Sequence, residues 1–99
     1  PIIPPSIYKP IISNYTLSEQ DNGQTLVTKS VGLIIVIPSS GLSDNFCCLI
    51  TTTTGNPCSI SLSDGVVVDA PNGLSISENE TLSIGRLKDA TYDEFIIRP

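Results

Sequence analysis

The chain has 99 residues, enough for one domain with a modest core, since a chain of this size buries roughly two-thirds of its unfolded surface. Ten acidic residues against five scattered basic ones give a net charge of −5, which argues against nucleic-acid binding. No apolar run approaches the roughly 20 residues that a membrane-spanning helix needs.

Bulky side chains are few. The chain has two Phe, three Tyr and no Trp or Met, so the core must consist of Ile, Val and Leu. Such a core is thin for a lone domain, and shared apolar surface between identical copies would enlarge it. We therefore expect an oligomer. The N-terminus lacks the charged region and the continuous apolar stretch of a signal peptide, so we expect synthesis in a cytosol.

Residues 1–13, with the sequence PIIPPSIYKPIIS, hold half of the prolines. Proline lacks a backbone donor and favours extended geometry in its predecessor, which excludes a helix or a central strand here. We predict an extended arm that docks on a partner or a neighbouring subunit; the alternative is an arm folded back on its own domain. The predicted partner-binding residues are Ile2, Ile3, Ile7, Tyr8, Ile11 and Ile12.

Residues 14–99 form the predicted domain. Turn signals such as Asp21-Asn22-Gly23 arrive about every 8–12 residues, and no segment has a convincing helical period. We predict an all-β domain, either a small antiparallel β-sandwich or a barrel-like meander. In the strand predicted at residues 24–29, Leu26 faces inward. The alternation slips between Gly85 and Leu87, which predicts a β-bulge.

A continuous apolar run, LIIVI, occupies residues 33–37. Such a run is typical of a strand covered on both faces, either in the centre of a sandwich or in a subunit interface. The chain is too small to cover both faces of this strand generously. We therefore predict that Ile34 and Val36 lie in a subunit interface.

Paired carboxylates are the first candidates for chemistry. Asp93 and Glu94 are adjacent in a predicted strand and therefore point to opposite faces. Asp64 and Asp69 flank a turn and a short strand, and we expect them to shape turns. Calcium held at a loop by oxygen ligands is an alternative, but the alternating Asp/Asn pattern of such loops is missing. We predict no catalytic, cofactor-binding or metal-binding residues, and hence no enzyme.

The three cysteines are Cys47, Cys48 and Cys58. An odd number does not suit a complete set of disulfides within one chain, and the absence of His leaves a zinc site without a fourth ligand. We expect three reduced, small apolar residues. Disulfides between subunits are the alternative.

Several segments follow one another in a characteristic order. They are YTLSEQDNGQTLV, a strand ending in Ile-Pro (LIIVIP), a Phe-led strand (NFCCLI), an alternating strand (CSISL), the run DGVVVDAPNGLSI, and a closing Leu-Ser-Ile-Gly-Arg-Leu strand. In this order, residues 15–98 resemble a small β domain found in phage head-fibre, capsid-decoration and tail-fibre proteins. The chain departs from that pattern in the Cys47-Cys48 pair and at Tyr92, where Trp is often expected.

The resemblance implies a trimeric virion component without enzymatic activity or cofactor. The expected function is that of a capsid-decoration or cement protein, which binds the major capsid protein or another virion protein. The expected location is the virion, after synthesis in the host cytoplasm. The alternatives are a tail-fibre or receptor-binding module for host surface glycans, and a small cellular adhesion domain.

Overall fold

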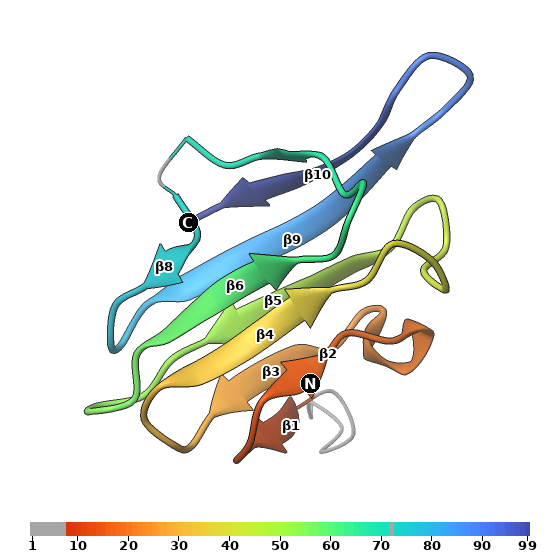
Figure 1. The fold of residues 1–99 in the computed structure, drawn as a ribbon. Helices are drawn as coiled ribbons and strands as arrows, with labels where there is room; N and C mark the ends of the chain where they lie inside the picture. The colour runs from red at the N-terminus through yellow and green to blue at the C-terminus, as the bar shows by residue number, and fades with distance from the viewer. Residues whose placement is uncertain (1–7, 72) are drawn as a thin grey trace, which may run out of the picture.

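The computed structural model describes residues 8–71 and 73–99, which form ten strands and one short 3-10 helix (Figure 1). The elements in chain order are β1 (Tyr8–Ile11), β2 (Tyr15–Thr16), η2 (Glu19–Asp21), β3 (Thr25–Thr28), β4 (Leu33–Ile37), β5 (Cys47–Thr51), β6 (Cys58–Leu62), β7 (Val68–Asp69), β8 (Ser75–Ile76), β9 (Thr81–Lys88) and β10 (Asp93–Arg98). The predicted all-β class is confirmed.

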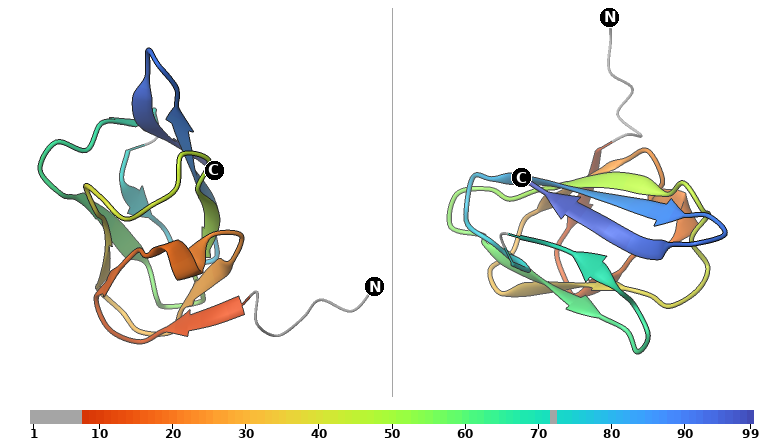
Figure 2. Two further views of the ribbon diagram at one scale, coloured as in Figure 1. Left: turned by 90° about the vertical axis from the view of Figure 1, so that its right-hand side faces the viewer. Right: turned by 90° about the horizontal axis from the view of Figure 1, so that it is seen from above.

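The strands form two sheets, which Figure 2 shows as two layers. Sheet A has the order β1-β3-β5-β9-β10-β7, and sheet B has the order β2-β4-β6-β8. From β1 to β6 the chain alternates between the sheets, so each of the first four strands pairs in parallel with the strand two places ahead. The first six strands are therefore successive turns of a coil, and the core lies inside it.

The predicted antiparallel pairing and meander order are wrong. A parallel pair needs a crossover connection, and here a strand of the opposite sheet provides it. In the described part of the chain, antiparallel strand pairs are confined to β5–β9, β9–β10 and β6–β8. The turn at Gly55-Asn56 carries the chain from sheet A to sheet B, so β5 and β6 form no hairpin. A turn sequence predicts a reversal, but not which sheet the next strand joins.

The core consists mainly of aliphatic side chains that alternate inward along the strands, as period-two geometry requires. Leu26 is fully buried between half-buried Thr25 and Val27, as predicted. The buried apolar residues are Ile11, Leu17, Leu26, Leu33, Ile35, Ile37, Leu42, Phe46, Cys48, Ile50, Cys58, Ile60, Ile76, Leu82, Ile84, Phe95 and Ile97.

Several large apolar side chains face outward instead of joining the core, and two of them, Ile34 and Leu87, bear on the sequence predictions. In β4, Ile34 is 39% exposed, so this chain covers the run on its inner face and leaves the outer face open. In β9, the pairing with β10 continues through Gly85 without a bulge, which corrects that prediction. Arg86 takes the inward-facing position, and Leu87 points outward.

Part of the predicted arm belongs to the domain. Residues 8–11 form β1, an edge strand of sheet A, and Ile11 is only 3% exposed in the core. An edge position suits Pro10, which has no donor for a further strand. Tyr8 and Ile12 are exposed. The other predicted arm residues, Ile2, Ile3 and Ile7, lie outside the described residues.

Buried threonine hydroxyls fix the turn that crosses between the sheets. The hydroxyl of Thr28 donates to the carbonyl of Asn56 at 2.9 Å, and the hydroxyl of Thr53 donates to the carbonyl of Thr28 at 2.6 Å. The hydroxyl of buried Thr52 accepts the N–H of Glu80 at 2.9 Å and donates to the carbonyl of Ser77. These bonds join β3, the crossing turn and the start of β9.

We predict that Thr52→Val destabilises the fold by roughly 1–3 kcal/mol, because the near-isosteric side chain leaves buried backbone groups without partners. Urea unfolding followed by circular dichroism measures the change. Thr91→Val, in the exposed β9–β10 turn, is the matched control and should change little. Equal effects of the two substitutions would contradict the role given to Thr52.

Candidate functional site

A buried carboxylate lies where the coil begins. Asp21, the last residue of η2, has 0% of its surface exposed. Its oxygens accept the hydroxyl of Tyr15 at 2.8 Å and the backbone N–H of Ser18 at 2.8 Å. The bond from Ser18 is the reciprocal half of a capping box and turns the chain sharply after β2.

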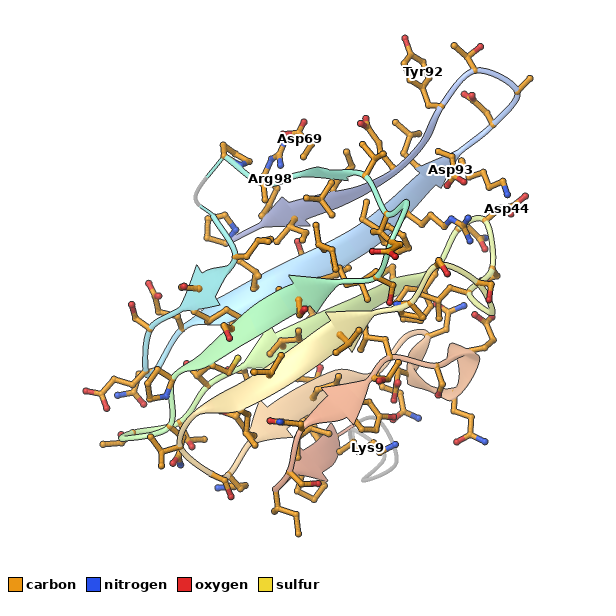
Figure 3. All side chains as sticks on the ribbon, viewed as in Figure 1. Lys9, Asp44, Asp69, Tyr92, Asp93 and Arg98 are labelled. Atoms are coloured by element: carbon orange, nitrogen blue, oxygen red, sulfur yellow. The ribbon has the colours of Figure 1, made fainter. Side chains whose placement is uncertain are left out.

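Lys9 brings a compensating charge from β1. Its ammonium donates to the hydroxyl of Tyr15 at 2.6 Å, lies 3.6 Å from a carboxylate oxygen of Asp21, and sits 4.5 Å from the centre of the Tyr15 ring. The hydrogen bond to Tyr15, followed by the attraction of Asp21, raises the pKa of Lys9 above its ordinary value. Figure 3 shows Lys9 at the β1–β2 end of the molecule.

The Lys9–Tyr15–Asp21 cluster holds β1, β2 and η2 together and is not a reactive centre. The hydroxyl of Tyr15 accepts from one partner and donates to the other, and in residues 8–71 and 73–99 no buried side-chain N or O atom lacks a hydrogen-bond partner. Sequence reasoning missed this cluster because Asp21 was assigned only to a turn. The spacing Ser18-x-x-Asp21 was the available signal.

We predict that Asp21→Asn destabilises the protein by roughly 1–3 kcal/mol, because an amide nitrogen replaces an acceptor that serves buried donors. Asp44→Asn removes the same charge from an exposed loop (Figure 3) and should be close to neutral. The measurement is the free energy of unfolding of both variants. If Asp21→Asn lowers the free energy of unfolding no more than Asp44→Asn does, the structural role of the cluster is disproved.

The predicted carboxylate candidates do not converge. Asp69 pairs with Arg98 at 3.2 Å and links β7 to β10, and Figure 3 shows the two side by side. Asp93 pairs with Arg86 at 3.1 Å, at the base of the β9–β10 hairpin. Glu94 alternates with Asp93 along β10, and Asp64 lies in an exposed turn. Two of the four carboxylates thus hold elements together.

Among the described residues, no group of three or more His, Cys, Asp or Glu side chains is placed to hold a metal ion. The cysteines are three free thiols, of which Cys47 is exposed while Cys48 and Cys58 are buried. Burial raises the pKa of Cys48 to about 12 and also raises the pKa of Cys58. Because the thiolate is the reactive form, we expect these two thiols to react slowly in the folded state.

We therefore predict that an alkylating reagent at pH 8 modifies at most one cysteine of the folded protein and all three after unfolding. Intact mass spectrometry counts the added groups, and peptide mapping assigns them. Labelling of Cys48 or Cys58 without unfolding would contradict the buried positions of these residues.

The predicted interface residues lie on the outward face of sheet B. Ile34 pairs with Ser59, and Val36 lies between Thr16 and Ser61. The N–H of Ile34 donates to the side-chain oxygen of Asn14 at 2.9 Å, which fixes the start of the strand. These residues form an uncharged strip with two apolar side chains at its centre.

A shallow groove of about 300 Å³ lies beside the end of this strip, where β4, β6 and β8 meet. Its lining includes Gly32, Pro57, Ser75 and Ser77, together with Cys58. None of its lining residues carries a charge, so the groove offers hydroxyl and backbone groups but no group for acid–base chemistry.

No helix within residues 8–71 and 73–99 is long and apolar enough to span a membrane. Comparisons of the chain with protein-family models, curated proteins and solved structures gave no significant match.

Proposed function

We propose that this chain is a bacteriophage virion structural protein, a capsid-decoration or cement protein that binds the shell as an oligomer, with a trimer as the expected state. The phage assignment rests on the sequence resemblance of residues 15–98. The single observation in the fold that supports an assembly role is the open, uncharged outer face of β4 around Ile34 and Val36.

This face is suited to burial against another protein. Full burial of an Ile or Val side chain stabilises by roughly 1.5–3 kcal/mol. The neighbouring residues of the strip, Thr16, Ser59 and Ser61, carry hydroxyls, which can be desolvated at far lower cost than charges. The edge strands β2 and β8 of sheet B are two residues long, which disfavours association through the edges.

The shell contact is assigned to the N-terminal segment and the exposed apolar residues next to β1. Ile11 is part of this chain's own core, so it is removed from the docking set. The residues that remain are Ile2, Ile3 and Ile7, together with exposed Tyr8 and Ile12.

The docking role predicts that removal of residues 1–7 abolishes co-sedimentation with capsids that lack the protein. The melting temperature should stay close to that of the full chain, because β1 and the Lys9–Tyr15–Asp21 cluster are kept. Undiminished binding to capsids would overturn the docking role. Binding to a glycan array without binding to capsids would favour the receptor-binding alternative.

The interface role predicts that Ile34→Asp and Val36→Asp lower the oligomeric state before they disturb the strands. Native mass spectrometry reports the assembly, and far-UV circular dichroism reports the fold. Val67→Asp places the same charge at an exposed apolar residue outside the strip and should leave the assembly unchanged. An oligomer that survives both substitutions in β4 would refute this interface.

A further inference from the structure

The outward face of sheet A carries mostly uncharged side chains. One row of side chains crosses four strands through Tyr8, Thr25, Leu49 and Ser83. A second row contains Val27, Thr51 and Thr81. From β1 to β9 neither row carries a charge, although 15% of the residues in the chain are charged; on β10 the first row continues to Arg98, which lies opposite Ser83.

The rows form a face that includes exposed apolar side chains. Tyr8 is 47% exposed and Leu49 is 39% exposed. The hydroxyls of Thr51 and Thr81 bond to each other at 2.9 Å, so they already have a partner within the face. A contact over the centre of this face would therefore bury apolar surface without leaving a charged group buried and unpaired.

Charged residues lie along the rim of this face. Asp69 and Arg98 pair on the β7 side (Figure 3), and Glu94 of β10 lies opposite outward-facing Leu87. Pro10 lies in one edge strand of sheet A, and the other edge strand, β7, has only two residues. Both features disfavour strand addition at the edges, so association through sheet A would use its outward face.

We propose that the outward face of sheet A is a self-association surface that packs on the same face of a second copy. The net charge of −5 opposes the approach of two copies in most orientations. A neutral face is the place where two acidic chains can meet without bringing carboxylates together. The same face on a second copy has the same uncharged centre and the same small side chains.

The face is large enough for this contact. The five strands of sheet A other than two-residue β7 span roughly 19 Å at a spacing of about 4.8 Å, and with four to eight residues each they are roughly 13–26 Å long. The pleat and the side chains add to that area, which is of the same order as the ~800 Å² per partner of a standard interface. Two such faces would stack about 10 Å apart, as sheets do in sandwiches.

This proposal does not rest on the proposed virion function: the surface lies on the opposite sheet from Ile34 and Val36, and it shares only Tyr8 with the docking residues. Leu49→Glu places like charges at the centre of the contact and should weaken self-association on the order of a hundredfold. Val31→Glu adds the same charge at a 72%-exposed apolar turn residue and should associate like the unchanged chain. Sedimentation velocity over a range of concentrations measures both variants.

Cys47 lies on the same face, opposite Gly85. The reactivity of its thiol therefore shows whether a second copy covers the face. In the unchanged chain, the alkylation rate of Cys47 should fall as the protein concentration rises. Leu49→Glu should abolish this protection, whereas Ile34→Asp and Val31→Glu should keep it. If Leu49→Glu does not fold, Thr81→Glu replaces it in both measurements, because Thr81 is exposed on β9.

The proposal is overturned if the folded glutamate variant associates as strongly as Val31→Glu, or if Cys47 is equally reactive at all concentrations. Loss of Cys47 protection in Ile34→Asp would also overturn it, because sheet B would then control the contact. The failure of capsid binding would leave this surface unaffected.

Discussion

The structure depends on the burial of one layer of mainly aliphatic side chains from each of the two sheets. Leu26 and Ile50 of sheet A, and Ile35 and Ile37 of sheet B, have no exposed surface. Because the chain alternates between the sheets from β1 to β6, each turn of the coil extends both halves of this core together. The core is only one side-chain layer deep from each sheet, so the ends of the coil must be closed by other means.

Each end is closed by groups of a different kind. At the β1–β2 end, Asp21 is buried and bonds Tyr15, and Lys9 balances its charge. At the opposite end, the antiparallel strands β9 and β10 complete sheet A. Buried polar groups stabilise a fold when all their hydrogen bonds are made, and they destabilise it when one partner is lost. The thin aliphatic core thus relies on a few fully bonded polar residues.

The outer surfaces follow from the same alternation. Residues between the buried positions point outward, and in the centres of both sheets they are Ser, Thr and aliphatic residues. Hydroxyl groups keep such a face hydrated in a single chain, yet they can be desolvated at far lower cost than charges when a partner covers it. The ion pairs lie at the strand ends and loops, where they connect elements such as β7 and β10.

The sequence by itself determined the all-β class, the turn at Asp21-Asn22-Gly23 and the inward side of residues such as Leu26, because alternation and turn chemistry are local properties. Gly23, for example, takes the positive φ of 79° that its turn signal indicates. Only the tertiary structure decided that the strands coil in parallel, that Tyr8–Ile11 joins the sheet, that Asp21 is buried and that Ile34 and Leu87 face outward. These features depend on which distant strands become neighbours, and a turn sequence does not specify the sheet that the chain enters next.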